Sequence, residues 1–323
     1  MKRTVMIASL SAMLLMGCEY KPLCYDFEMS GTGTLLFDWK GDTTCVTSYM
    51  KTVFHGDKED DVRSFDMPGR DGGAYRLMPG AWTPVAWNGD AEAILMRGTE
   101  FPETYIAYTR TTSVKSATRM ESRGEMPQVK APSEPVIVEP DPLWFGLGAG
   151  IWVLPNRDAG ETVVSMEPRT ISIDITIHDI PNLKWTTQFG GSLTGLAAGV
   201  HCATGIPLSE PATEAFYMYS PADSTLNLNI TSFGLCPEKD GSYPQNHLTV
   251  YLILGDGTQW YCVMDVTEAL RGAPFDERTL TLSLDLYGGI PVPAPMSGSS
   301  GFLPTIDEWY GVEIELSMNP NPK

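Results

Sequence analysis

The chain has 323 residues, of which 40 are Asp or Glu and 22 are Lys or Arg, so its formal net charge is −18 at neutral pH. A surface this acidic repels nucleic acid phosphates and anionic lipid headgroups, which excludes binding to either of them through a basic patch. The length suggests two domains of about 150 residues, each large enough to bury a core.

The first eighteen residues have the pattern of a lipoprotein signal. Two cationic residues precede an apolar run, residues 4–16, that is too short to span a bilayer as a helix. The small residue Gly17 and then Cys18 follow. The stretch resembles the bacterial lipoprotein signal, which implies a signal peptide over residues 1–17, cleavage after Gly17 and acylation of Cys18. An ordinary secretory signal with an incidental cysteine is the alternative.

Five further cysteines follow the one assigned to lipid. A secretory signal implies an oxidising compartment in which disulfides persist, and an odd number leaves at least one thiol unpaired within the chain. No two of them have the C-x-x-C spacing of zinc or redox sites. We therefore expect one or two structural disulfides and a buried thiol, with a pairing that the sequence does not assign, among Cys24, Cys45, Cys202, Cys236 and Cys262.

Residues 31–110 are expected to form short strands separated by turns. Residues 33–39 alternate apolar and polar side chains with the two-residue period of a half-buried strand. Further strands are expected at residues 46–54 and 62–67, and Asp71-Gly72 favours a tight hairpin turn after the second of them. No stretch of ten residues here has the pattern of a helix.

Residues 110–142 have a different character. Five cations are followed by five prolines, which resist both helix and central strand, so a long exposed loop is expected, with residues 110–130 as its protease-sensitive part. Residues 144–154 are apolar enough to return to a sheet. The polar cluster at residues 155–158 then predicts the boundary between an N-terminal domain, residues 18–156, and a C-terminal domain, residues 157–323.

The second half contains the clearest strand patterns. Apolar and polar residues alternate over residues 171–177, 226–230, 280–286 and 312–316, and residues 248–263 read as a hairpin. The one helix expected runs over residues 265–271, with Asp265 as its N-cap. This alternation is typical of antiparallel sheets with one buried face. The fold class expected is all-β, with two antiparallel β-sandwich domains in tandem.

The sequence contains no recognisable catalytic or cofactor-binding motif. It has no nucleophile elbow, Gly-rich phosphate loop or paired zinc-binding histidines. Asp57, Glu59 and Asp61 alternate as in a calcium loop, but Val62 replaces the glycine of the sharp turn, so a solvated loop is expected. We therefore predict no enzyme, no cofactor and no metal site. The tryptophans could stack on sugars, but core packing is expected for the three on strand patterns, Trp39, Trp185 and Trp260.

Several short segments together resemble a known family. They include residues 23–26 and 37–39, Gly69-Arg70-Asp71-Gly72-Gly73, residues 96–98, 105–110 and 141–144, Gly191-Ser192-Leu193-Thr194-Gly195-Leu196, and Asp307-Glu308-Trp309. Their order resembles the Bacteroidales fimbrillin superfamily, in particular its lipoprotein branch related to fimbrial anchor subunits. The resemblance implies two transthyretin-like β-sandwich domains and attachment to the outer membrane, and it supplies no catalytic residues.

The resulting hypothesis is an outer-membrane lipoprotein, held by lipid on Cys18, that anchors or assembles a fimbrium at its base. Its partners would be fimbrial subunits, met through strand-to-strand contacts. Stalk subunits of the resembled family lose their first strand by proteolysis. Here that cut would sever the lipid, so a different surface is expected to meet the neighbour, involving the C-terminal residues. A surface glycan-binding lipoprotein is the alternative. The sequence gives neither the particular partner nor the periplasmic or surface face.

Overall fold

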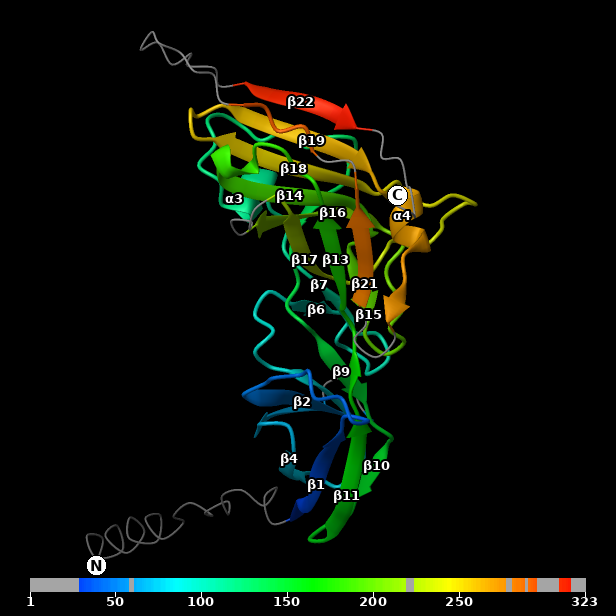
Figure 1. Cartoon of the computed structure of the whole chain (residues 1–323). Helices are drawn as coiled ribbons and strands as arrows, with labels where there is room; N and C mark the ends of the chain where they lie inside the picture. Colours follow the sequence, from blue (N-terminus) through cyan, green and yellow to red (C-terminus); the bar gives the residue numbers. More distant parts are fainter. Residues whose placement is uncertain are drawn as a thin grey trace, which may run out of the picture.

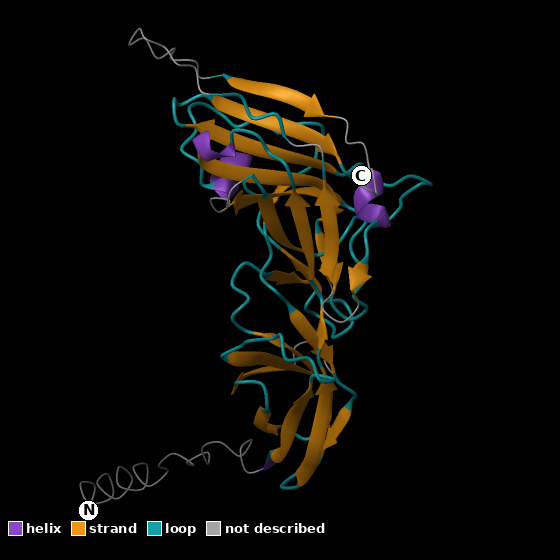
Figure 2. Ribbon diagram, in the orientation of Figure 1, coloured by secondary structure: helices purple, strands orange, loops and turns teal. Residues whose placement is uncertain are grey.

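The protein is described here by a computed structural model that covers residues 29–57, 61–218, 224–276, 281–287, 290–294 and 308–314. The described chain is built almost wholly from β-strands, with a few short helical turns (Figure 2). Two β-sandwiches lie one after the other along an elongated molecule (Figure 1). The all-β fold class predicted from the sequence is thus confirmed.

The N-terminal sandwich consists of two sheets. The smaller has the strand order β11 (Asp158–Ser165), β1 (Gly31–Asp38), β4 (Gly72–Leu77). The larger has the order β12 (Glu167–Pro168), β9 (Trp144–Leu147), β5 (Gly80–Asn88), β2 (Tyr49–Gly56), β3 (Val62–Pro68), and β10 (Ile151–Val153) also pairs with β5. Alternate residues of β1 point into the core between the sheets, as its sequence pattern predicts.

The turn at Asp71-Gly72 does not form the predicted hairpin. The strand before it, β3, pairs with β2, whereas the strand after it, β4, pairs with β1 in the opposite sheet. Gly72 has φ +104°, and a Cβ there would lie 2.0 Å from the Leu35 carbonyl oxygen. Glycine is needed because the chain passes close to β1 as it changes sheet.

The C-terminal sandwich is larger. One sheet has the order β17 (Leu226–Ser232), β13 (Ile171–Ile177), β21 (Thr281–Leu286), β20 (Phe275–Asp276). The other has the order β22 (Trp309–Ile314), β19 (Gln259–Asp265), β18 (His247–Leu254), β14 (Thr186–Ala197), β16 (Pro211–Met218), β8 (Val136–Val138). Between them lies an aliphatic core that includes the predicted isoleucines Ile173, Ile175 and Ile177.

The predicted hairpin of residues 248–263 is present as β18 and β19. The predicted helix is present as α4 (Thr267–Gly272), and the Asp265 carboxylate accepts a hydrogen bond from the Thr267 N–H at its start. A short 3₁₀ turn, η1 (Leu183–Trp185), precedes β14. Four described strand pairs are parallel, which adds crossover connections to the antiparallel arrangement expected from the sequence: β1–β11, β13–β21, β16–β8 and β19–β22.

Residues 113–138 form a strap over the outer face of the C-terminal sheet, and the exposed loop predicted there is wrong. The strap contains α3 (Val114–Thr118) and β8, and its apolar side chains Val114, Met120 and Met126 pack with Tyr251. The side-chain oxygen of Gln259 accepts from the backbone N–H of Arg123. Because the strap covers the sheet, every residue of β18 is buried.

The chain crosses between the sandwiches more than once. The strap belongs to the C-terminal sheet, yet the next strands, β9 to β12, return to the N-terminal sandwich. The turn at residues 154–157 therefore lies inside that sandwich, because β11 pairs with β1 along most of its length. The strand pairing changes between Pro168 and Ile171. The division at residue 156 stays a prediction for domains as folding units, but it does not coincide with this crossover.

A third small sheet lies between the sandwiches. It has the order β15 (Gly199–His201), β7 (Ile106–Tyr108), β6 (Leu95–Arg97). The buried cluster around it takes side chains from both sandwiches, including Val85 and Phe145 on one side and Phe233 on the other. Tyr105 lies at its centre, and its hydroxyl is 2.9 Å from His55 Nε2. This shared cluster joins the two sandwiches through apolar packing.

Candidate assembly interface

The exposed sheet edges are the natural contact sites of an all-β protein, because their backbone groups can pair with another strand. The edge strand β3 is a poor candidate. Its exposed side chains include the charged Arg63 and Asp66, and it ends at Pro68, which lacks a backbone donor. Charge and proline of this kind hinder the addition of a strand.

The edge strand β22 has the opposite character. It pairs in parallel with β19, from Trp309 opposite Gln259 to Ile314 opposite Met264, and no described strand pairs with its other edge. A Cβ on Gly311 would lie 2.2 Å from the Tyr261 ring, so this glycine lets the ring lie against β22. It is also the outermost strand at the end of the molecule far from β1 (Figure 1).

The two faces of β22 differ. On the face toward the strap, Trp309 packs edge-on against Tyr251 with ring centroids 5.6 Å apart, and Glu313 forms a 2.8 Å ion pair with Lys130. On the opposite face, Tyr310 is 46% exposed and Val312 is 37% exposed. Their partners in β19, Trp260 and Cys262, belong to the buried core. Tyr310 and Val312 therefore extend the apolar face of the sheet beyond the part that its partner sheet covers.

A groove between β16 and β17 is a second opening of the same sandwich. It has a volume of about 640 Å³, and its lining includes Phe216, Leu228 and Glu139. The Glu139 carboxylate accepts from the backbone N–H of Thr231 at 2.9 Å. Because one edge donor of β17 is already occupied, an added strand would lose a hydrogen bond there. The edge at β22 is the better site for an added strand.

Glu214 is a buried carboxyl behind this groove. It is fully buried, and neither of its oxygens makes a hydrogen bond of normal geometry with a described residue. Burial, and then the charge of Glu139, raise the pKa of Glu214 well above its ordinary value, against a smaller opposing effect of the Ser232 hydroxyl. Burial likewise raises the pKa of Glu139.

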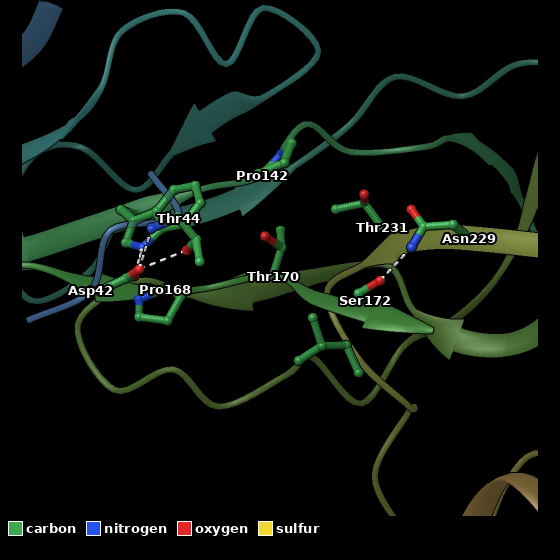
Figure 3. A pocket seen from close by; sticks show the side chains of 10 residues that line it. Asp42, Thr44, Pro142, Pro168, Thr170, Ser172, Asn229 and Thr231 are labelled. Atoms are coloured by element: carbon green, nitrogen blue, oxygen red, sulfur yellow. Dashed lines mark hydrogen bonds between the residues drawn. The ribbon is translucent and has the colours of Figure 1, made fainter. Parts of the chain in front are cut away.

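A polar pocket of about 230 Å³ lies at the junction of the sandwiches (Figure 3). The Asp42 carboxylate in its wall accepts from Thr44 N and Oγ1, at 2.7 and 2.6 Å, and from Trp144 Nε1 at 2.8 Å. Burial opposes ionisation of Asp42, but these bonds and the charge of Arg70 outweigh it and lower its pKa. Asp42 is thus an ionised, hydrogen-bonded group with a structural role, rather than an available proton acceptor.

The residues singled out in the sequence have different outcomes. Gly17, Cys18 and Cys24 lie outside the described residues, as does part of the acidic loop, residues 58–60. The four described cysteines are buried and free, so the expected disulfides are not found among Cys45, Cys202, Cys236 and Cys262. Burial raises the pKa of three of these thiols to about 12, namely Cys45, Cys202 and Cys262.

The tryptophans expected in the core are only partly there. Trp260 is buried and Trp39 is half-buried beneath the Arg70 guanidinium, but Trp185 is 46% exposed. Across the described ranges, no group of three or more His, Cys, Asp or Glu side chains is placed to hold a metal ion. In the same part of the chain, no helix is long and apolar enough to cross a membrane.

Comparison with known proteins identifies the family. A family described as a domain of unknown function, DUF5119, matches residues 17–216, which is more than half of the chain. The chain belongs to this family. The matched residues run from the predicted cleavage site through the N-terminal sandwich and the strap to β16.

A relative connects the family to fimbriae. The chain is 30% identical over 99 residues to a Bacteroides ovatus protein provisionally named fimbrium anchoring subunit Fim4B. That stretch is 31% of this chain and spans only 29% of the relative's length. The resemblance to fimbrial anchor subunits is confirmed in this stretch.

Two solved structures have a related fold. A protein of Bacteroides ovatus provisionally described as an adhesin superposes with a TM-score of 0.51 and 18% identity, covering 86% of this chain and 99% of that one. The fimbrial anchor protein Mfa2 from Porphyromonas gingivalis has a TM-score of 0.45 and 10% identity, with 80% and 90% covered. The first likeness supports the tandem-sandwich fold.

Proposed function

We propose that this protein is a lipid-anchored subunit that attaches a fimbrium to the outer membrane. The observation that carries the proposal is the 30% identity to a protein named as a fimbrium anchoring subunit. Two further features support it, the lipoprotein signal ending at Cys18 and the absence from the described residues of any metal-holding cluster. The protein acts as a structural link rather than as an enzyme.

The partner is a fimbrial subunit that adds an extended segment beside β22. Backbone groups of β22 provide hydrogen bonds, while the exposed faces of Tyr310 and Val312 provide apolar contact that the partner would cover. This strand lies at the end of the molecule opposite β1, which follows the predicted lipid site. A chain held to the membrane at one end thus offers a free sheet edge at the other.

The anchor is tested in cells with Cys18→Ala. We expect the sandwiches to fold, but the protein and its fimbriae to appear in the medium rather than on the cells. Cys24→Ala is the matched control, since it changes the same residue type six positions away and leaves the predicted lipid site intact. If fimbriae stay cell-bound and normal in length with Cys18→Ala, this protein is not their anchor.

The interface is tested with Val312→Lys. Lysine beside the free edge disfavours an added strand, so capture of fimbrial subunits should fall strongly. Val62→Lys on β3 is the matched control, because Val62 is 38% exposed and Val312 is 37% exposed. Both variants should unfold within about 0.5 kcal/mol of wild type. Equal loss in both variants, or retention on a polysaccharide matrix in place of subunit capture, would count against the proposed interface.

A further inference from the structure

The end of the N-terminal sandwich carries an exposed apolar pair, Trp152 and Leu154. Trp152 is 66% exposed and Leu154 is 41% exposed, whereas Val153 between them is fully buried. The two side chains therefore share the outward face of one strand end. An exposed tryptophan of this degree has no role in the core of its own sandwich.

This pair lies where the chain enters the fold. The backbone N–H of Thr32 donates to the Arg157 carbonyl, and a Cβ on Gly31 would lie 2.6 Å from the Leu154 carbonyl oxygen. Figure 1 shows the start of β1 and the turn after β10 at the same end of the molecule. Thirteen residues separate Cys18 from Gly31, so the lipid can be at most about 45 Å away.

The charge of this end differs from the rest of the protein. Residues 29–37, 77–82 and 151–157 contain no Asp or Glu, and Arg157 is their one charged residue. The whole chain, by contrast, has a net charge of −18. The electrostatic repulsion that keeps an acidic surface away from a bilayer is thus weakest here.

We propose that Trp152 and Leu154 insert into the headgroup region of the membrane and orient the protein on it. Tryptophan suits this position because its ring is apolar while its indole N–H can bond to water or headgroups. The proposal rests on the lipid anchor at Cys18, since only the tether brings this end to the membrane. It assigns this surface to lipid, whereas β22 faces the fimbrial subunit.

The test uses the full mature chain carrying Cys18→Ala and neutral phosphatidylcholine vesicles, so that neither the acyl group nor an anionic headgroup contributes. We expect weak binding by flotation, with tryptophan fluorescence quenched by brominated lipid. Trp152→Ala should lower the bound fraction at least about five-fold and remove most of the quenching. Trp185→Ala is the matched control, because Trp185 is 46% exposed in the other sandwich, and it should change neither readout.

Several results would overturn the proposal. They are absence of vesicle binding, equal effects of Trp152→Ala and Trp185→Ala, and self-association abolished by Trp152→Ala, which would assign the surface to a second copy. Stronger vesicle binding after deletion of residues 19–28 would show that the chain's own N-terminal segment covers the pair. Shedding of Cys18→Ala protein from cells tests the lipid anchor separately, because the vesicle measurement does not depend on acylation.

Discussion

The two sandwiches reach stable cores by different means. In the N-terminal core, nine of fourteen buried residues are aromatic or contain sulfur, whereas in the C-terminal core only six of twenty-six are. The C-terminal sheet is also covered on both faces, because the strap packs on the face away from the core. The larger sandwich thus uses strands with regular aliphatic alternation plus an added layer. The smaller one fills its interior with large, adaptable side chains.

The difference would be greatest in the response to a buried charge. Ile173→Asp places a carboxylate in the aliphatic core, where it has no partner and no room for water. The cost should be several kcal/mol, on the order of the stability of a whole domain. Thermal melting should show loss of the C-terminal sandwich, and the shared cluster around Tyr105 should make the N-terminal sandwich melt with it. Melting like wild type would mean that Ile173 does not face the core.

The added layer is tested with Met126→Ala in the strap. Met126 is 7% exposed, so its loss should reduce the free energy of unfolding by about 2–4 kcal/mol. Met29→Ala is the control, since Met29 is 51% exposed and should cost little. Limited trypsin digestion should cut the Met126→Ala protein at Arg119 and Arg123 faster than wild type. Rapid cutting of the wild-type strap would instead support the exposed loop predicted from the sequence.

A smaller, pH-dependent difference is expected from Glu214. Its pKa is raised in the folded state, so the unfolded chain loses this proton first as pH rises, and stability falls above the unfolded pKa. Glu214→Gln should match wild type near pH 4 and be more stable by about 1–3 kcal/mol at pH 8. Urea unfolding at the two pH values measures this. A gap that is the same at both would show that Glu214 is ionised in the folded protein.

The smallest effect is expected at the ion pair that holds β22 to the strap. The Lys130 and Glu313 side chains are 34% and 69% exposed, so water and salt screen their attraction. Lys130→Ala should change stability by less than about 0.5 kcal/mol. A loss above 1 kcal/mol in chemical denaturation would mean that β22 depends on this pair rather than on its packing against Tyr261.

The sequence predicts the C-terminal sandwich better than the N-terminal one, for a physical reason. A strand with one dry face needs apolar residues at every second position, which is visible in residues 171–177 without any structure. Residues 158–165 form β11 but read as a polar stretch, so the predicted boundary was placed before them. Which sheet a strand joins depends on long-range crossovers, and neither the turn at Gly72 nor the one at residues 154–157 encodes that choice locally.

The strap was missed because its charges and prolines outweighed a weaker signal. Thr118, Met120 and Ser122 are buried and alternate with exposed Arg119, Glu121 and Arg123, which is the same period-two pattern at lower contrast. Part of the candidate interface was nevertheless predicted, since the alternation at residues 312–316 indicates the strand that became β22. Its free edge and uncovered face follow from the unequal widths of the two sheets, which no local pattern reveals.

The position of β1 has a mechanical consequence. This strand lies between β11 and β4, and it is the first part of the fold to meet any pull transmitted from Cys18. It runs from the anchored end toward the far sandwich (Figure 1), so a pull along the molecule drags β1 lengthwise past both neighbours. Lengthwise loading strains the hydrogen bonds on both sides together rather than one after another. A fimbrium dragged by flow would therefore load the fold in its more resistant direction.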